Sequence, residues 1–513
     1  MIWTPQDIQQ LKALNIPAEK ATQDLKTFRR GIAKYPIERA AKVGDGILLL
    51  KPREERKLLQ FFEKAQPSTE MLKFVPASGA ATRMFKPLLA FLEASEASDF
   101  SFSEYLKAHP EVSEFIKEAH HFPFHEAVLE CLPSHFSFDA PAAVKDYLKA
   151  LLTPFGLNYG AKPKALLNFH KEVQGHPIVL EEHIEEALHY AQNKGVAQLH
   201  FTISPQHLTA FKQAIQDIEA SDRFKNQTAF DIEFSYQRSE TDTLVVGMDL
   251  HPLRDSSGKL VFHPAGHGAL LENLAGLKAD AIFIKNVDNV GALQHRETSL
   301  RYKKILGGKL LQVQQQMFAY TEALDSTIEL DETDLSFMVS YYEETFSKTL
   351  PEYYHEMPLE EQRAYLLVLF NRPIRVCGMV ENEGKTGGGP FWIKDAEGQE
   401  MLQIMEASQL ALKDPEQFEI FQEATHFNPV DLVCGIKNYR GENHDLHAFK
   451  NPDTAFIAEK NRLGKRVRVL ELPGLWNGGM WAWNTIFIEV PKETFTPVKT
   501  VLDLLDSGHM PAE

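Results

Sequence analysis

A run of small residues between an apolar segment and a helix-like segment is the first feature of the sequence that can do chemistry. The apolar segment is residues 72–76, and Thr82, Arg83 and Lys86 follow the run. The run itself consists of Ala77, Ser78, Gly79, Ala80 and Ala81. Small side chains let backbone N–H groups approach a phosphate, and the start of the next helix adds a favourable partial charge. Arg83 can bind phosphate oxygens through two hydrogen bonds, and Lys86 adds a point charge. The loop therefore indicates phosphate binding, and the alternative is a tight strand-to-helix turn with an exposed basic helix start.

A second loop, His263-Pro-Ala-Gly-His-Gly268, precedes another helix-like segment. The glycines on either side of His267 permit a close backbone approach to a ligand. His267 can then donate a hydrogen bond to a sugar or phosphate oxygen. The alternative is a plain turn in which the histidine is structural.

A carboxylate follows the clearest buried strand of the sequence. Residues 281–285 read Ala-Ile-Phe-Ile-Lys, and Asp288 comes shortly after them. Ligands of open α/β sheets bind beyond the carboxyl ends of the strands, where Asp288 is expected. Mg²⁺ favours one or two carboxylates together with substrate phosphates, so Asp288 is a candidate magnesium ligand. The alternative is an aspartate that caps a turn.

Together, these three segments resemble the UDP-sugar and UDP-N-acetylhexosamine pyrophosphorylases, which are uridylyltransferases with a GT-A-like fold. Residues 77–84, ASGAATRM, are similar to the nucleotide loop of that family, and 263–268, HPAGHG, to its Pro-x-Gly-His-Gly loop. Residues 281–289, AIFIKNVDN, are similar to its strand ending in Asp-Asn. Weaker similarities lie at 234–237, 406–410 and 427–428. The resemblance spans roughly 70–300 and, more loosely, 370–490, and the whole chain also resembles an uncharacterised bacterial family, a domain of unknown function.

The resemblance implies a role for each matched residue. Arg83 would contact the triphosphate or the departing pyrophosphate, with Lys86 as a further catalytic cation, and Asp288 would bind Mg²⁺. His267 would lie near the sugar phosphate, and Glu406 and Asn428 would contact the sugar. The nucleotide-binding residues would be Ala77, Ser78, Gly79, Ala80, Ala81, Thr82, Gln237 and Gly266.

The sequence departs from the family pattern at two positions, and both bear on activity. Ala81 stands where the family has a second glycine. An alanine would be strained there if the backbone needed a positive φ. Lys86-Pro87 reverses the usual Pro-Lys order, so the position of the catalytic lysine is left open.

Two more segments have functional character without a family match. The loop 384–389, Gly-Lys-Thr-Gly-Gly-Gly, can serve as a lid over phosphates with Lys385 as a catalytic cation, or it is a hairpin. The segment 476–483 gathers three tryptophans around Asn477 and a glycine pair. Asn477 can meet a sugar hydroxyl while a tryptophan stacks on the sugar face, or the segment is an aromatic corner with an Asn-Gly turn.

The composition excludes some classes of partner. The chain has 513 residues and a net charge of −17, which disfavours a general nucleic-acid surface but leaves a local basic pocket possible. The three cysteines, Cys131, Cys377 and Cys434, are far apart and predict neither a disulfide framework nor a zinc site. We find no signal peptide or membrane-length apolar stretch and expect a cytoplasmic protein with small-molecule substrates, no nucleic acid or membrane partner, and an undetermined oligomeric state.

Strand-like segments alternate with helix-like ones and predict an α/β fold, a GT-A-like core with a mainly parallel mixed sheet. Residues 1–66 are expected to form a helical N-terminal region. Residues 67–300 would form the nucleotide-binding core, interrupted by a helical insertion at 98–195. A helical segment at 301–370 and the sugar-side half at 371–513 would complete the chain.

The sequence therefore predicts a Mg-dependent nucleotidyltransferase that makes a UDP-sugar and pyrophosphate from UTP and a sugar 1-phosphate. Two alternatives remain open. One is a glycosyltransferase that uses a nucleotide sugar, and the other is a non-catalytic nucleotide-sugar-binding protein.

Overall fold

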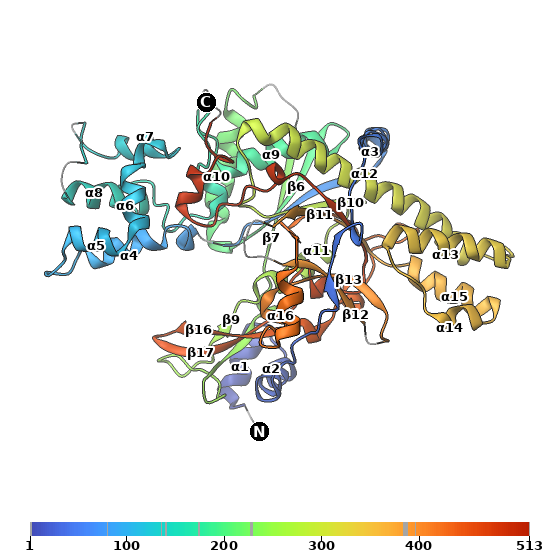
Figure 1. The fold of residues 1–513 in the computed structure, drawn as a ribbon. Coiled ribbons are helices and arrows are strands. Elements are labelled where there is room, and N and C mark those ends of the chain that lie inside the picture. Colours follow the sequence, from blue (N-terminus) through green and yellow to red (C-terminus); the bar gives the residue numbers. More distant parts are fainter. Residues whose placement is uncertain are drawn as a thin grey trace. The chain divides into compact units, whose positions relative to one another are not determined.

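The computed structural model divides the chain into two compact units, each made of several chain segments (Figure 1). Unit 1 consists of Met1–Met71, Gln237–Ile284 and Lys304–Val490, and unit 2 of Leu72–Tyr236, Lys285–Lys303 and Pro491–Glu513. The structure describes residues 3–79, 81–134, 136–138, 141–172, 175–225, 229–382, 388–395 and 397–511. The domains expected from the sequence were continuous segments, whereas the units are discontinuous because distant strands pair within each of them.

Unit 2 contains three parallel strands, and the first of them ends at the predicted phosphate loop. Strand β4 (Met71–Pro76) pairs in parallel with β6 (Val196–Ile203), and β6 pairs in parallel with β7 (Phe230–Tyr236). Parallel neighbours need long crossovers, and helices supply them here. The crossover between β6 and β7 is α10 (Leu208–Ala220), and β5 (Gln192–Asn193) joins β6 as a short antiparallel strand.

Part of the predicted helical insertion at 98–195, together with the helix that precedes it, forms an aromatic cluster of helices in unit 2. Its members are α4 (Lys86–Ala94), α5 (Phe102–Ala108), α6 (Pro110–Lys117), α7 (His125–Glu130) and α8 (Pro141–Leu152). Phe122 and Phe124 stack with ring centroids 5.3 Å apart, and Phe85 meets Phe124 edge-on at 6.4 Å. The same core buries Met84 after the phosphate loop and Val290 after Asp288, so the helical cluster supports both predicted loops.

A buried ion network fixes α9 (Val179–Tyr190) to the ends of two strands. Lys73 of β4 and Lys285, the last residue of β10 (Ala281–Lys285), each place Nζ 2.7 Å from a different carboxylate oxygen of Glu186. Lys73 also donates to the backbone carbonyl of His183 at 3.0 Å. Burial lowers the pKa of Lys73 to about 7 although Glu186 opposes the shift. Burial alone would raise the pKa of Glu186, but Lys285 and Lys73 hold it well below its ordinary value.

Unit 1 contains three groups of strands. In the largest, β3 (Gly46–Leu48), β18 (Asn484–Glu489) and β11 (Ile374–Glu381) are parallel neighbours, and β15 (Asp431–Gly435) pairs antiparallel with β11. The other members of this group are β2 (Lys42–Val43), β14 (His426–Phe427) and β10. A second group is β1 (Arg39–Ala40), β12 (Gly389–Lys394) and β13 (Glu400–Met405), and a third is β16 (Phe456–Arg462), β17 (Lys465–Glu471), β8 (Thr243–Gly247) and β9 (Phe262–His263).

The helices of unit 1 begin where the sequence places its caps. A capping box of Thr4 and Asp7, with Pro5 at the first position, starts α1 (Pro5–Ala13), and α2 (Ala18–Arg30) packs on β8. The remaining helices are α3 (Pro52–Ala65), α11 (Leu270–Ala275), α12 (Leu293–Leu324, in this unit from residue 304), α13 (Glu332–Phe346), α14 (Glu352–Glu356), α15 (Leu359–Phe370) and α16 (Pro415–Gln422).

The strand pairings confirm the predicted α/β class with a mainly parallel mixed sheet. Strand β10 has the predicted bounds, and α3 lies in the region 1–66 that was predicted to be helical. Residues 263–268 do not form a simple loop, because His263 ends β9 and a 3₁₀ turn begins at Gly266. Within the described ranges, no helix is long and apolar enough to cross a membrane.

Candidate functional site

The small-residue loop of unit 2 is anchored on both sides by its backbone. The amide of Ala77 donates to the carbonyl of Thr202 at 2.8 Å, at the end of β6, and the hydroxyl of Ser204 donates to the carbonyl of Ser78 at 2.8 Å. The amide of Ala81 donates to the carbonyl of Lys162 at 2.9 Å. The loop is therefore held between β6 and the segment 158–166, and its middle is left to face solvent.

The exposed part of this loop has the character of a ligand cradle. Gly79 is exposed, and a Cβ added there would meet nothing within 4 Å, so open space adjoins its backbone. Thr82, Arg83 and Lys86 are exposed beside it, and Thr82 donates to the carbonyl of Gly160 at 3.3 Å. Ala80, also predicted to bind the nucleotide, lies outside the described residues.

Ala81 fits the backbone without the strain that the departure from the family pattern suggested. It starts a short 3₁₀ turn (Ala81–Arg83) and is not among the residues with positive φ. Its methyl group is fully buried in the aromatic core of unit 2. An alanine is therefore compatible with this position, because the chain does not need the conformational freedom of a glycine there.

Asp288 lies in a triad with two lysines. Lys164 places Nζ 2.8 Å from Oδ2, and Lys499 places Nζ 3.1 Å from Oδ1 and 2.9 Å from Oδ2. The Asp288 side chain is 9% exposed and that of Lys164 13%, whereas the side chain of Lys499 is 59% exposed. The triad thus carries two positive charges and one negative charge, with one ammonium group facing solvent.

The chain segment 496–501 delivers Lys499 to this position. The amide of Val498 donates to the carbonyl of Asp288 at 3.0 Å, and Lys164 donates to the carbonyl of Val498 at 2.5 Å. The amide of Val501 donates to the carbonyl of Met84 at 3.1 Å. These contacts bring the first and third predicted motifs together within unit 2, through Lys162-Pro-Lys164 on one side and residues 498–501 on the other.

The charges of the triad determine its protonation. Burial alone would raise the pKa of Asp288, but Lys164 and Lys499 hold it below the ordinary value of an aspartate. Burial lowers the pKa of Lys164, and the neighbouring Asp288 opposes that shift. Burial also lowers the pKa of Lys162, whose Nζ lies 5.5 Å from the centroid of the Tyr159 ring.

A resident magnesium ion at Asp288 does not fit this arrangement. Both carboxylate oxygens accept hydrogen bonds from ammonium groups, which repel a divalent cation. In addition, the part of the chain that the structure describes contains no group of three or more His, Cys, Asp or Glu side chains that could hold a metal. We therefore derive no catalytic step through a metal bound by Asp288.

The second predicted motif belongs to unit 1 and is described there by itself. Gly266 has a φ of +57°, a conformation that favours glycine, and its carbonyl accepts a hydrogen bond from Nε2 of Gln237 at 3.1 Å. His267 is exposed, and its ring lies 4.3 Å from that of Trp476. The structure thus places Gln237 in contact with Gly266, two residues for which the resemblance implied a place near the uracil, and His267 in contact with the tryptophan segment.

Glu406 and Asn477 are also neighbours in unit 1. Nδ2 of Asn477 donates to Oε1 of Glu406 at 3.1 Å, and Oδ1 of Asn477 accepts from the backbone amide of Gly478 at 2.6 Å. Burial and the nearby Glu471 raise the pKa of Glu406, while the hydrogen bond from Asn477 opposes the shift. This carboxylate is therefore easier to protonate than an exposed glutamate and presents an acid or acceptor beside the tryptophan segment.

A buried arginine positions the tryptophan segment. Arg375 is fully buried on β11 and donates to the carbonyl of Trp476 at 2.6 Å, to Thr485 at 2.8 Å and to Oε1 of Gln403 at 2.9 Å. Gln403 in turn donates to the carbonyl of Trp481 at 2.5 Å. The arginine thus holds both ends of the segment, a role that nothing in the local sequence indicated.

Two predicted residues have other surroundings. The Asn428 side chain is buried, donates to the carbonyl of Gly378 at 3.1 Å and accepts from the amide of Val430 at 3.0 Å, so it supports a turn at Val430. A sugar contact would have to compete with both bonds. Lys385 and most of its glycine-rich loop lie outside the described residues.

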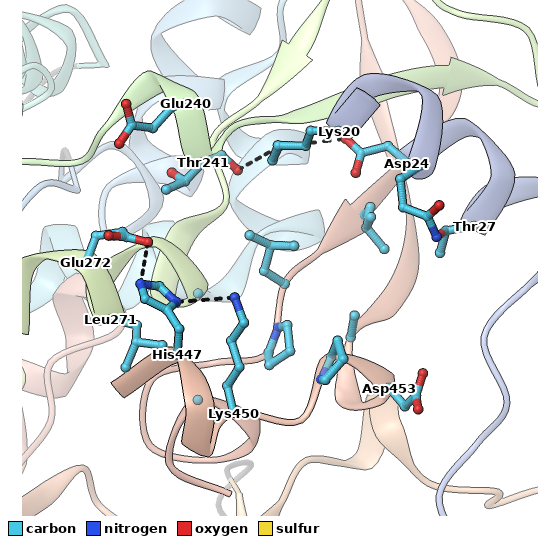
Figure 2. A pocket seen from close by; sticks show the side chains of 18 of the residues that line it. Lys20, Asp24, Thr27, Glu240, Thr241, Leu271, Glu272, His447, Lys450 and Asp453 are labelled. Carbon is cyan, nitrogen blue, oxygen red and sulfur yellow. Dashed lines mark hydrogen bonds and ion pairs between the residues drawn. The ribbon is translucent and has the colours of Figure 1, made fainter. Parts of the chain in front are cut away.

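A cavity of about 650 Å³ in unit 1 is lined in part by Gly268 of the second predicted motif and by Gly479 of the tryptophan segment (Figure 2). On one wall Glu272 contacts His447 at 2.9 Å, and Lys450 lies 3.3 Å from His447. On another, Lys20 of α2 donates to the carbonyl of Thr241 at 3.3 Å. Its lysines and acids are interspersed, so the cavity lacks the concentrated positive charge that a polyphosphate requires.

These features describe an α/β protein whose second unit presents a cationic, solvent-facing loop cluster. The chain belongs to the family described as "Domain of unknown function (DUF4301)", whose model matches residues 4–510. No curated protein matches the chain.

The chain is similar to solved structures that are described as pyrophosphorylases. The uridine diphosphate N-acetylglucosamine pyrophosphorylase from Trypanosoma brucei is 11% identical with a TM-score of 0.49, over 98% of this chain and 79% of that one. The UDP-glucose pyrophosphorylase from Leishmania major is 12% identical with a TM-score of 0.44, over 97% and 77%.

Proposed function

We propose that the protein is a nucleotidyltransferase that forms a UDP-sugar and pyrophosphate from UTP and a sugar 1-phosphate. The observation that carries this proposal is the loop cluster of unit 2, where the backbone around Gly79 and the exposed Arg83 share a support with Lys164 and Lys499. A local concentration of cations on a chain of net charge −17 is the signature of an anion site rather than of a generally basic surface.

In this reaction, a phosphate oxygen of the sugar 1-phosphate attacks the α-phosphorus of UTP in line. The bond from the α-phosphorus to the bridging oxygen breaks, and its electron pair leaves with pyrophosphate. Phosphoryl-type transfers of this kind depend mainly on positioning and on stabilising the developing negative charge. Arg83 and the two lysines, together with the backbone around Gly79, supply such stabilisation without an acid–base triad.

Unit 1 carries the residues for which the sequence resemblance implies contacts with the uracil and the sugar. We assign the uracil to Gln237 and Gly266, whose contact positions an amide beside a backbone carbonyl. We assign the sugar to His267, Glu406 and Asn477, which adjoin the tryptophan segment. Magnesium enters this proposal as part of the substrate, the magnesium complex of UTP.

The test is pyrophosphate release from UTP with a panel of sugar 1-phosphates. The expected result is release with one class of sugar and its loss in Arg83→Ala, with Lys212→Ala on α10, an exposed lysine of the same unit, as the control. Absence of release with every sugar would refute the proposal. Tight nucleotide-sugar binding without turnover would identify the non-catalytic alternative, and transfer of the sugar from a nucleotide sugar would identify the glycosyltransferase.

A further inference from the structure

The cavity of unit 1 is lined by apolar and charged side chains from several parts of the chain (Figure 2). One wall is a face of α2, because its lining residues recur every three or four positions, as one side of a helix requires. They are Lys20, Gln23, Asp24, Thr27 and Arg30. The apolar lining residues include Leu271, Leu470, Leu472, Pro473 and Ala455. Small-molecule sites have this mixed character, and a cavity of about 650 Å³ lies within their usual range of volume.

Most of the charges on the α2 side of the cavity are paired within the protein. Asp24 accepts a hydrogen bond from the amide of Leu244 at 3.0 Å, and its Oδ2 lies 3.8 Å from Nζ of Lys20. Glu240 lies 3.2 Å from Arg238, which is not a lining residue. These groups therefore hold the wall together and leave little charge for a ligand.

A chain of three side chains ends in a lysine at the second wall. Nε2 of His447 lies 2.9 Å from Oε1 of Glu272, and Nζ of Lys450 lies 3.3 Å from Nδ1 of His447 (Figure 2). An ammonium group can only donate, so Nδ1 of the histidine is the acceptor. The ammonium group of Lys450 has three donors, and this contact leaves two of them for a ligand.

The lining charges that remain are of both signs. Within the described ranges, no ion pair or side-chain hydrogen bond reaches the guanidinium group of Arg30 or the carboxylate of Asp453. Apart from Glu240, the lining contains three cations and three acids, namely Lys20, Arg30 and Lys450 against Asp24, Glu272 and Asp453. The cavity is therefore close to neutral but offers donors at one point and acceptors at another. A ligand that matches this pattern carries one negative and one positive group.

We infer that this cavity binds an amphipathic zwitterion of the size of a short apolar peptide. Its anionic end is assigned to Lys450, its cationic end to Asp453, and its apolar body to the leucine and proline side chains of the lining. The volume favours a ligand larger than a single amino acid, and the balanced charge disfavours a polyphosphate. The site goes beyond the proposed function, since neither the nucleotide nor the sugar was assigned to it.

The position of the cavity also gives the ligand a regulatory role, which rests on the proposed function. Gly268 follows His267, and Gly479 lies two residues after Asn477, and both glycines line the cavity. A Cβ at Gly268 would lie 2.5 Å from Cβ of Leu472, so the backbone there is packed directly against another lining residue. A ligand in the cavity thus contacts the chain within two residues of two side chains assigned to the sugar.

The test titrates the dipeptide leucyl-leucine into the full-length protein, with heat as the readout and without nucleotide or sugar. The wild type is expected to bind it at least about tenfold more tightly than N-acetyl-leucyl-leucine or leucyl-leucinamide, since each blocked form loses one charge-assisted contact. Asp453→Asn should remove the preference over the acetylated form only, and Lys450→Met the preference over the amide only. Lys57→Met on α3, an exposed lysine outside the cavity lining, is the matched control and should keep both preferences.

The regulatory role has its own readout. Three of the five tryptophans lie in the segment 476–483, and the dipeptide has no aromatic ring, so its binding should change the tryptophan emission. Absence of binding, equal binding of the blocked forms, or unchanged preferences in Asp453→Asn and Lys450→Met would overturn the site. Binding with unchanged emission would overturn the regulatory role.

The failure of this inference is distinguishable from that of the transferase. Dipeptide binding without UDP-sugar synthesis would leave the cavity site standing and refute the transferase. UDP-sugar synthesis by a protein that does not bind the dipeptide would support the transferase and refute the cavity site.

Discussion

Replacing Glu186 with glutamine should strongly destabilise unit 2. Its two carboxylate oxygens each meet a lysine ammonium group at 2.7 Å, and the side chains of Lys73 and Lys285 are 0% and 2% exposed. Removing one partner of a buried ion pair leaves uncompensated charge and typically costs about 3–5 kcal/mol. For a folding unit of about 150–250 residues this corresponds to a fall in melting temperature of roughly 6–20 °C.

The effect should also depend on pH in a defined direction. The pKa of Lys73 is about 7 in the folded protein, below the value of about 10.4 for an unfolded lysine. Between these values the unfolded chain binds more protons, so the free energy of unfolding rises with pH. In Glu186→Gln the ammonium group of Lys73 loses the carboxylate that opposed the lowering of its pKa, so the loss of stability relative to wild type should be largest near pH 6 and smaller near pH 9.

The assay is thermal unfolding at pH 6, 7.5 and 9 with Glu219→Gln, an exposed glutamate of α10, as the control. Lys73→Met should lower the melting temperature far less than Glu186→Gln, because it removes a buried charge instead of leaving one without a partner. The reasoning would be refuted if Glu186→Gln unfolded at the same temperature as Glu219→Gln, or if its deficit grew as the pH rose.

Three further predictions concern the loops of the two units. Gly478→Ala should cost roughly 1–3 kcal/mol, since its Cβ would lie 1.7 Å from Oγ1 of Thr454. Thermal unfolding compared with Gly276→Ala, whose added Cβ would make only ordinary contacts, would show this, and equal stability would contradict it. Arg375→Met should alter the tryptophan fluorescence and near-UV circular dichroism of the segment that it positions, and unchanged spectra would show that the segment holds itself. Arg83→Ala should leave the melting temperature within about 1 °C of wild type, because surface substitutions rarely change the free energy of unfolding by more than about 0.5 kcal/mol. The same substitution should abolish the thermal stabilisation by UTP, and retained stabilisation would place the triphosphate elsewhere.

Local patterns predicted the strands and the loops that end them. Strand β10 and the small residues after β4 were evident because an uninterrupted apolar run bounded by small or polar residues has few other structures open to it. The likeness of 77–84 and 281–289 to known motifs then named the phosphate loop and Asp288. The resemblance also named Gln237 and Gly266 as neighbours of the uracil, and the structure shows that these two residues contact each other.

The partners of those residues could not be predicted in the same way. Lys164 is 124 positions from Asp288 and Lys499 is 211 positions from it, and single lysines on an acidic chain carry no local signal. The Lys162-Pro-Lys164 sequence was the available hint, since two lysines flank a proline there. Without them, Asp288 was interpreted as an open carboxylate, and an open carboxylate in that position suggests a metal. Arg375 was missed for the same reason, because its role depends on a segment brought close only by folding.

The most direct test of the account is isotope exchange between labelled pyrophosphate and UTP, measured in the presence of Mg²⁺ and a panel of UDP-sugars. The proposed chemistry predicts that label enters UTP with at least one UDP-sugar, and that Lys499→Met and Arg83→Ala slow the exchange at least tenfold while Lys212→Met does not. Exchange that proceeds at the wild-type rate in both loop-cluster variants, or that fails with every UDP-sugar, would contradict the assignment of the phosphates to unit 2.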